Sequence, residues 1–324
     1  MLSLHPASYT DPHVFLLGQN VGKYQILQNL GSGGFGTVFL VRDTWIDKRV
    51  AIKVPHRQSG REDDLLQESR LLAALNHPNI VSILTAEKID GTFFIVMEYV
   101  KGESLEGLLD REKVLDQFKA VELAVQILKG VEHAHKAQIL HRDLRPANVL
   151  VSEDGVLKVA DFGTSRILDK AHANTIIGSP PYMAPEQFAG KAQLPADVYS
   201  VGVMLYQMLT GMLPYFSPNP AEIERMVSQG RCTAPRVRNS RISKELSDIV
   251  MKAMAPDLTV RYLSASELLE DLQTAADIDH RQTEMEEIRK RLRARESPRR
   301  GLCWNCGRPQ PQRSTKCPFC GETL

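Results

Sequence analysis

The chain has 324 residues, enough for about two domains, and 43 % of them are hydrophobic, so a sizeable core can form. Its 40 basic and 39 acidic residues give a net charge of +1, so no global field favours nucleic acid or a membrane as the partner. The N-terminus has no basic segment followed by an apolar run, so we expect no signal peptide and a soluble cytoplasmic protein. Residues 198–209 are apolar but too short to cross a membrane, and Ser200 and Gln207 interrupt them, so they are expected to form a buried helix.

Residues 1–23 are mixed in composition and rich in turn signals, and they are predicted to form an irregular leader. A strand-like segment begins at Tyr24 and runs into a glycine-rich stretch made of Leu30, Gly31, Ser32, Gly33, Gly34, Phe35, Gly36, Thr37 and Val38. Glycines let backbone amides approach a phosphate closely, although a plain glycine-rich hairpin turn has the same composition. In dinucleotide-binding folds such a stretch opens a helix, whereas here a strand-like run follows. The pattern therefore favours a hairpin that covers phosphates.

The next strand, residues 50–53, reads V-A-I-K and ends in a lysine. An isolated lysine at a strand end is usually a solvated charge, but after a phosphate-covering hairpin Lys53 is a candidate ligand of phosphates. A helix predicted over residues 62–75 offers Glu68 as the carboxylate that would hold this lysine in place. Residues 93–100 then form a further apolar strand, which we expect to be buried.

The central stretch of the chain is residues 141–148, which read H-R-D-L-R-P-A-N. It follows a helix-like run at residues 121–134 and precedes a strand-like run at residues 149–151, so it is predicted to be a short loop between buried elements. Its acid, amide and guanidinium groups suit a reaction that must position anions and a metal ion. After another strand, residues 161–163 read D-F-G and add a carboxylate of the kind that Mg²⁺ prefers.

In this order the motifs resemble those of the eukaryotic-type (Hanks-type) Ser/Thr protein kinases, and the resemblance covers residues 24–276. Residues 178–186, G-S-P-P-Y-M-A-P-E, are similar to the peptide-docking end of the kinase activation segment. Arg261 is similar to the arginine that pairs with the last residue of that segment, here Glu186. The resemblance implies an α+β fold with a small β-rich lobe and a larger α-helical lobe, which clamp Mg-ATP between them.

The resemblance implies four residues with roles in catalysis. Asp143 would orient the hydroxyl of a protein substrate and accept its proton, and Arg145 would steady the γ-phosphate. Lys53, held by Glu68, would bind the α- and β-phosphates. The alternative is a pseudokinase, a binding scaffold of kinase shape, which would be expected to lack Lys53, Asp143 or Asp161; all three are present.

The cofactors implied by the resemblance are ATP and Mg²⁺, the latter held by Asn148 and Asp161. The nucleotide would be enclosed by the glycine-rich stretch together with Ala51, Lys53, Glu98, Val100 and Leu150. Glu98 and Val100 would offer backbone groups to adenine, at the hinge that follows Met97.

Two positions depart from the pattern of the family. Arg145 stands where Ser/Thr kinases usually carry lysine; it keeps the charge and adds a bidentate fork but is bulkier. Ser179 stands where threonine is commoner and retains the hydroxyl. Pro146 and the composition of residues 178–186 resemble a Ser/Thr enzyme more than a tyrosine kinase.

The resemblance also suggests a regulatory site. Arg142 precedes the catalytic aspartate, where a guanidinium can pair with a phosphate on the activation segment. Between residues 166 and 178 that segment contains one hydroxyl side chain, Thr175. We therefore expect Thr175 to be the activating phosphosite, modified in trans by a second copy in a homodimer, with an unmodified polar residue as the alternative.

Residues 277–300 are strongly charged and are predicted to form a helix, because Met285, Ile288 and Leu292 recur at helical spacing. Acidic residues precede basic residues along this segment, which is the order that a helix dipole favours. A solvated linker helix is the favoured interpretation. A short coiled coil and a basic patch for an anionic partner are the alternatives.

Residues 301–324 contain two C-x-x-C-G motifs ten residues apart, formed by Cys303, Cys306, Cys317 and Cys320. Four thiolates around one tetrahedral ion leave no open position, so the motifs predict a structural zinc ribbon that needs its metal to fold. Disulfides are the alternative and fit poorly with the absence of a signal sequence. A protein partner is favoured for the ribbon, with nucleic acid as the alternative because Trp304 and Phe319 permit stacking on bases.

Overall fold

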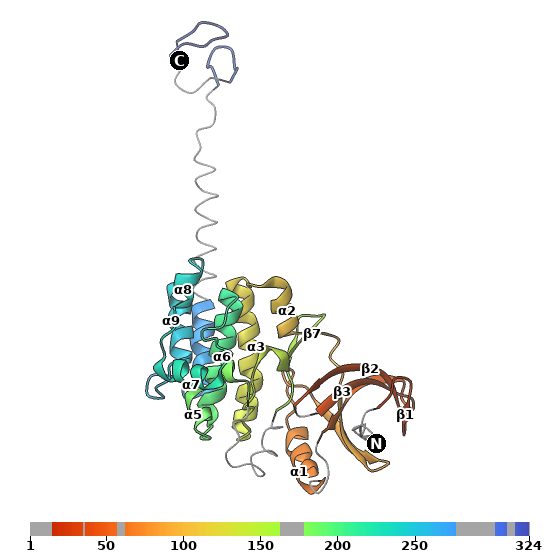
Figure 1. Cartoon of the computed structure of the whole chain (residues 1–324). Coiled ribbons are helices and arrows are strands. Elements are labelled where there is room, and N and C mark those ends of the chain that lie inside the picture. The colour runs from red at the N-terminus through yellow and green to blue at the C-terminus, as the bar shows by residue number, and fades with distance from the viewer. Residues whose placement is uncertain are drawn as a thin grey trace, which may run out of the picture. The chain divides into compact units, whose positions relative to one another are not determined.

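The structure is a computed structural model, and it describes residues 15–34, 36–56, 62–162, 178–276, 302–309 and 315–323. For Glu62, Asp64 and Glu68 only the backbone is described. The chain divides into two compact units, Met1–Gln273 and Thr274–Leu324 (Figure 1). The charged helix predicted over residues 277–300 lies outside the described residues and stays a prediction.

An antiparallel six-stranded sheet forms the first part of the larger unit (Figure 1). Its strand order is β1-β2-β3-β4-β6-β5, and the bounds are Asn20–Val21 (β1), Tyr24–Gly33 (β2), Gly36–Asp43 (β3), Lys48–Pro55 (β4), Ile83–Ile89 (β5) and Thr92–Glu98 (β6). Apolar residues of successive strands bury one cluster, in which the rings of Tyr24 and Phe94 meet edge to face with centroids 5.8 Å apart. Phe15 packs on this cluster, 5.7 Å from Phe39 between ring centroids. Helix α1 (Glu62–Ala73) follows β4.

The sheet begins earlier in the chain than the sequence indicates. Residues 1–23 are expected to be irregular, but Asn20–Val21 forms β1 and pairs with β2. The turn between the two strands is possible because Gly22 takes a φ of +55°, which costs glycine little for want of a Cβ. A two-residue strand is too short to show a hydrophobic period, so its pairing is visible only in the tertiary structure.

The second part of the larger unit is mostly helical. Its small antiparallel sheet consists of β7 (Gly102–Ser104), β8 (Val149–Ser152) and β9 (Leu157–Val159). Its named helices are α2 (Leu105–Glu112), α3 (Gln117–Lys136), α5 (Pro185–Phe188), α6 (Leu194–Thr210), α7 (Pro220–Gln229), α8 (Pro235–Arg238) and α9 (Lys244–Ala253). Another helix covers residues 265–276, and two 3₁₀ turns are η1 (Pro146–Asn148) and η2 (Pro180–Tyr182). The α+β fold with a β-rich part and a larger helical part is confirmed.

Helices α3 and α6 lie side by side in the helical part (Figure 1). Helix α6 is buried along most of its length, which confirms the buried helix predicted over residues 198–209. Helix α9 approaches it closely at Gly202, where an added Cβ would lie 2.8 Å from the Cβ of Ala253. None of the described helices is long and apolar enough to cross a membrane.

A buried ion pair connects the start of α5 with the loop before the helix at residues 265–276. The Nη1 and Nη2 atoms of Arg261 donate to the two carboxylate oxygens of Glu186, at 2.9 and 2.8 Å. This bidentate pair confirms the pairing expected for the two residues. It holds the C-terminal end of residues 178–186 against the helical part, because both charges are satisfied only when the two segments are docked.

Candidate active site and metal centre

A cavity of about 610 Å³ lies between the six-stranded sheet and the helical part of the larger unit. Pockets that hold small-molecule ligands and cofactors have volumes in this range. Most of the predicted nucleotide-binding residues line it, namely Leu30, Gly31, Ser32, Gly33, Gly34, Gly36, Val38, Ala51, Lys53, Glu98, Val100 and Leu150. Thr37 is not among the lining residues, and Phe35 lies outside the described residues.

The glycines of the β2–β3 hairpin have two different physical roles. At Gly36 an added Cβ would lie 2.5 Å from the carbonyl oxygen of Val54, so packing against β4 requires glycine there. At Gly31, Gly33 and Gly34 an added Cβ would meet nothing within 4 Å. The packing of the described residues therefore does not explain these three glycines. All three line the cavity, and glycines in such open space would let the phosphates of a nucleotide approach the backbone closely.

Lys53 on β4 is buried, and its Nζ lies 2.7 Å from Oδ1 of Asp161. Asp161 has a φ of +63°, an uncommon conformation for a residue other than glycine, and this conformation places its carboxylate at the lysine. Glu68 lies on α1 as expected, but its side chain is outside the described part of the chain, so its pairing with Lys53 stays a prediction.

The carboxylate of Asp143 is held from two sides. The backbone N–H and the Oγ–H of Ser179 donate to its Oδ1, at 3.0 and 3.1 Å. Asn148 lies in η1, and its Nδ2 donates to the Asp143 carbonyl oxygen at 2.8 Å and to Oδ2 at 3.2 Å. Asp143 and Asn148 both line the cavity that Lys53 and Asp161 also line. The structure thus brings these four predicted site residues together.

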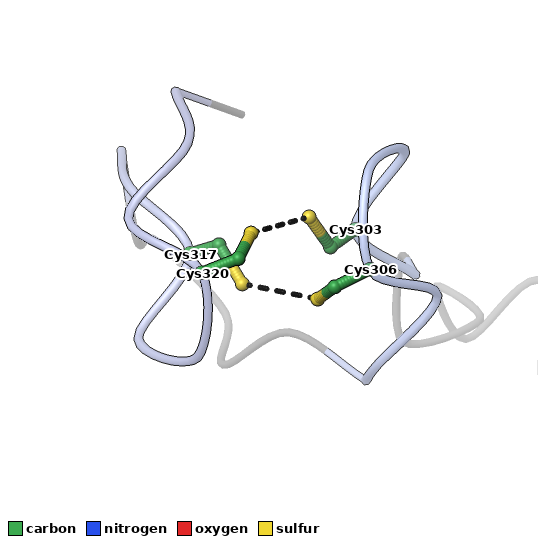
Figure 2. A group of neighbouring side chains, drawn as sticks. All are labelled: Cys303, Cys306, Cys317 and Cys320. Atoms are coloured by element: carbon green, nitrogen blue, oxygen red, sulfur yellow. Dashed lines mark hydrogen bonds between the residues drawn. The ribbon is translucent and has the colours of Figure 1, made fainter.

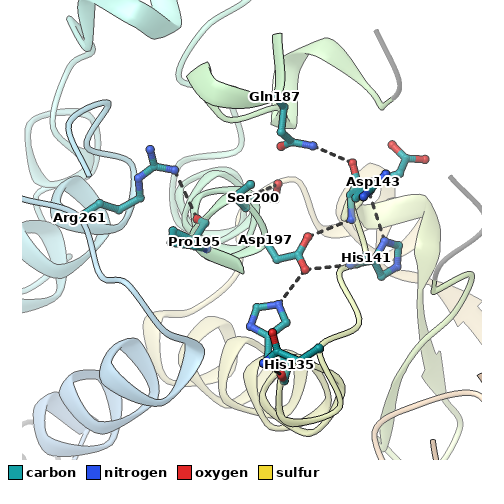
Figure 3. Close-up of polar contacts among 11 residues, drawn as sticks. His135, His141, Asp143, Gln187, Pro195, Asp197, Ser200 and Arg261 are labelled. Atoms are coloured by element: carbon teal, nitrogen blue, oxygen red, sulfur yellow. Dashed lines mark hydrogen bonds and ion pairs between the residues drawn. The ribbon is translucent and has the colours of Figure 1, made fainter. Parts of the chain in front are cut away.

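The carboxylate of Asp197, on α6, is fully buried and contacts the backbone of the loop at residues 141–148 (Figure 3). It accepts the backbone N–H groups of His141 and Arg142, at 2.9 and 3.0 Å, and Nε2–H of His135 at 2.8 Å. Burial alone would raise the pKa of Asp197, but the hydrogen bonds from His135 and from the loop outweigh it and hold the pKa below its ordinary value. These bonds stabilise Arg142 at a φ of +69°, which an isolated chain rarely adopts.

Two further contacts complete the loop. Nε2 of Gln187, on α5, donates to the carbonyl oxygen of Arg142 at 2.9 Å (Figure 3). The guanidinium of Arg145 donates from Nη1 to Ser179 Oγ at 3.2 Å and from Nη2 to Glu106 Oε1, on α2, at 3.4 Å. Gln187 and Glu106 were not expected from the sequence. An acid in the first turn of a helix is common, so nothing in the local pattern singles out Glu106.

The predicted phosphosite Thr175 lies outside the described residues. Arg142, its predicted partner, lies in the loop beside Asp143. The regulatory pairing of these two residues therefore stays a prediction.

The four C-terminal cysteines converge in the smaller unit (Figure 2). Their Sγ atoms all lie within 4.8 Å of one another; Cys303 is 3.5 Å from Cys320, and Cys306 is 3.6 Å from Cys317. These separations are far longer than a disulfide bond of about 2.05 Å. Four thiolates at about 2.3 Å from one zinc ion stand about 3.8 Å apart, so the cluster fits tetrahedral zinc.

The backbone of each cysteine motif folds into a knuckle around its glycine. Gly307 takes a φ of +67° and donates its N–H to the carbonyl oxygen of Cys303 at 2.9 Å. Gly321 takes a φ of +78° and makes the same bond to Cys317. The two turns bring both thiols of each motif to one side, as the C-x-x-C-G pattern predicts.

The comparisons with known proteins agree with this geometry. The family model described as "Protein kinase domain" matches residues 24–272, so the chain belongs to the protein kinase family. Its similarity to the Ser/Thr kinases given in the next paragraph places it among the Hanks-type Ser/Thr kinases, which confirms the family expected from the motifs.

One relative is a probable serine/threonine-protein kinase of Clostridium perfringens, 34 % identical over 267 residues, which are 80 % of this chain and 39 % of that protein. Another is the serine/threonine-protein kinase PrkC of Bacillus subtilis, 34 % identical over 82 % of this chain and 42 % of that protein. The solved structure of Rad53 in complex with AMP-PNP has a TM-score of 0.67 at 27 % identity, and covers 76 % of this chain and 64 % of that chain. The chain spans about two fifths of the length of these two curated relatives.

Proposed function

We propose that this chain is a serine/threonine protein kinase that transfers the γ-phosphate of Mg-ATP to hydroxyl groups of protein substrates. The observation that carries the proposal is the convergence of Asp143, Asn148, Lys53 and Asp161 in one cavity under a glycine-rich hairpin. The names of the two curated relatives support the reaction class. The AMP-PNP bound in the Rad53 structure, an analogue of ATP, supports the nucleotide.

In this proposal Asp143 acts on the substrate hydroxyl. Ser179 fixes Oδ1 of Asp143 with two hydrogen bonds, and Asn148 contacts Oδ2. A carboxylate held in this way can orient a hydroxyl group and accept its proton as the oxygen attacks. Arg145, in contact with Ser179, lies at the same edge of the cavity and would steady the γ-phosphate.

Asn148 and Asp161 would hold Mg²⁺, because an amide oxygen and a carboxylate suit an ion that keeps several waters. When bound, Mg²⁺ neutralises charge on the phosphates. Lys53 would bind the α- and β-phosphates, with Glu68 as its proposed carboxylate partner. Backbone groups of Glu98 and Val100, which line the cavity, would contact adenine.

The experiment that tests the proposal is phosphate transfer from Mg-ATP to a generic protein substrate by the parent and two variants. Asp143→Asn and Lys53→Met should each lower the rate at least about 10²- to 10³-fold, because positioned acid–base groups and phosphate clamps contribute that much. Asp154→Asn, at an exposed turn between β8 and β9, is the matched control and should not change the rate.

Melting temperatures of the variants are measured beside the rates, because Lys53 is buried beside Asp161 and the Asp143 carboxylate accepts three hydrogen bonds, so a rate lost through unfolding must be recognised. Full activity of Asp143→Asn would overturn the assignment. A parent protein that is stabilised by Mg-ATP and transfers no phosphate would instead be a pseudokinase scaffold.

We further propose that Thr175 is phosphorylated in trans by a second copy of the chain. A phosphate adds a charge of about −1.5 to −2, which would order the activation segment by bonds to Arg142. Mass spectrometry of the protein after incubation with Mg-ATP tests this proposal, and a Thr175→Ala variant as fast as the parent would contradict it.

The cysteine cluster is proposed to hold one structural Zn²⁺, which requires reduced thiols and therefore supports a cytoplasmic location. The ribbon exposes Leu302, Trp304 and Phe319 on a short segment, which supports a role as a docking module for a protein. Nucleic acid remains the alternative partner. Oligonucleotide binding that weakens steeply as salt rises would support that alternative.

A further inference from the structure

The side chain of Arg145 connects two elements at the edge of the cavity. Nη2 donates to Glu106 on α2 at 3.4 Å, and Nη1 donates to Ser179 in the peptide-docking stretch at 3.2 Å. The same Ser179 hydroxyl donates to Oδ1 of Asp143 at 3.1 Å. Glu106, Arg145, Ser179 and Asp143 thus form one chain of polar contacts that ends at the proposed catalytic carboxylate.

An arginine so close to the Asp143 carboxylate can form a bidentate pair with it, which a lysine cannot. A guanidinium presents five donors in a planar fork that matches the two oxygens of a carboxylate, whereas an ammonium is a point charge. Arg145 and Asp143 are separated by one shared partner, the hydroxyl of Ser179. A direct bidentate pair would cover both oxygens of the Asp143 carboxylate. The Asp143 carboxylate would then be less accessible to a substrate hydroxyl.

Among the charged residues around Asp143, one carboxylate is in a position to bind the Arg145 guanidinium and keep it from Asp143. The charged residues that line the cavity with Asp143 and Arg145 are Lys53, Asp161, Glu98, Glu103 and Glu106. Three of these carboxylates have cationic partners elsewhere: Asp161 pairs with Lys53, Glu98 with Lys158, and Glu103 with Arg111. Glu106 is the carboxylate that bonds Arg145.

We propose that Glu106 is a positioning residue that keeps the Arg145 guanidinium directed toward α2 and away from Asp143. The proposal rests on the proposed kinase function. Glu106 acts through Arg145 and takes no part in the chemistry itself. Its role follows from the arginine at position 145, so it should disappear when that arginine is replaced by lysine.

The test is a double-mutant cycle on the full chain with Glu106→Gln, Arg145→Lys and the combined variant. In the parent background, Glu106→Gln should lower kcat about three- to tenfold, which is the range for a coupled, partly exposed charge pair. In the Arg145→Lys background, Glu106→Gln should not change kcat, because an ammonium cannot form the bidentate pair.

Two controls separate positioning from folding. Glu112→Gln alters a carboxylate on the same helix that bonds Arg111 and does not line the cavity, so kcat should not change. Glu106→Asp keeps the charge on a shorter side chain and should recover part of the lost rate. Melting temperatures of all variants are measured beside the kinetics.

Equal losses from Glu106→Gln in the arginine and lysine backgrounds would overturn the inference, since they would indicate a general structural role. An unchanged kcat in Glu106→Gln would overturn it as well. In either case a parent that phosphorylates its substrate, with Asp143→Asn inactive, would leave the kinase function standing. An inactive parent would remove the kinase function and this inference with it.

Discussion

Asp197 shows how one buried side chain can determine the geometry of a loop on another element. It is fully buried and charged, and it accepts three hydrogen bonds, two of them from backbone groups of the loop at residues 141–148. A buried carboxylate is costly unless its acceptors are filled, so the loop and the carboxylate stabilise each other. The left-handed Arg142 is held by the same bonds.

We predict that Asp197→Asn lowers the free energy of unfolding by about 2–4 kcal/mol, because an amide cannot replace a carboxylate that accepts three donors. The pKa of Asp197 lies below its ordinary value of 3.8 in the folded protein, so its contribution is present above that value and is lost as the pH falls through the lower folded pKa. Below about pH 4 the parent should therefore lose stability more steeply than the variant. Urea unfolding at several pH values measures both effects.

The matched control for this change is Asp248→Asn. Asp248 makes an exposed ion pair with Lys244, 3.0 Å apart, so the same chemical change should cost no more than about 0.5 kcal/mol. Equal losses at positions 197 and 248 would contradict the account of Asp197.

Helix α6 carries two tyrosines that are equally buried and differ in the partners of their hydroxyl groups. The Tyr206 hydroxyl donates to the carbonyl oxygen of Thr233 at 2.8 Å and accepts Nε–H of Arg238 at 2.7 Å. The Tyr199 hydroxyl has no hydrogen-bond partner among the described residues, although the Arg261 guanidinium lies 5.2 Å from the centre of its ring. The contacts of Tyr199 are therefore made by its ring, whereas Tyr206 also connects α6 to the segment around α8 through its hydroxyl group.

We predict that the two phenylalanine variants differ in their free energy of unfolding. Tyr206→Phe should lower the free energy of unfolding by about 1–3 kcal/mol, because it leaves Thr233 and Arg238 without their partner. Tyr199→Phe should be neutral or stabilise by up to about 1 kcal/mol, because it removes a polar atom with no described partner and keeps the ring. Each variant is the control for the other in thermal or urea unfolding. A larger loss at Tyr199 would show that its hydroxyl is satisfied.

At the scale of the whole molecule, the chain is built from two units of different physical kinds. The larger unit buries an extensive apolar core in the sheet and around α6. The described part of the smaller unit has two buried cysteines and exposes Leu302, Trp304 and Phe319. So short a segment cannot offset its loss of conformational entropy by apolar burial, and a metal ion at the four thiolates would supply the missing stability.

We predict one zinc ion per chain in protein purified without chelator, measured by elemental analysis. Cys303→Ser should lower zinc occupancy strongly, because it removes one of four ligands. Cys232→Ser is the matched control, since Cys232 lies in the larger unit beside Met251, and it should retain the metal. Zinc-free parent protein would contradict the metal assignment.

Deletion of residues 297–324 tests how the two units are related in function. Kinase activity on a generic substrate should survive the deletion if the ribbon recruits partners. Loss of that activity would instead show that the ribbon supports the kinase unit.

The sequence by itself determined which residues are the candidates for the chemistry. Lys53, Asp143, Asn148 and Asp161 lie in short motifs whose order is specific, and the cysteine pairs are set by local spacing. The α+β fold is implied by the resemblance of these motifs, in this order, to those of the protein kinases. Patterns of this kind involve residues close together in the chain, so they can be recognised from the sequence without a structure.

Only the tertiary structure decided the partners of these groups. Lys53 pairs with Asp161, which is 108 residues away along the chain. Asp197 accepts a hydrogen bond from His135, which is 62 residues away. In the sequence, Glu106 resembles any acid in the first turn of a helix. Only the folded chain brings its side chain into contact with Arg145, which is 39 residues away along the chain. Distances between side chains so far apart in sequence depend on how the elements pack, and packing is a property of the folded chain as a whole.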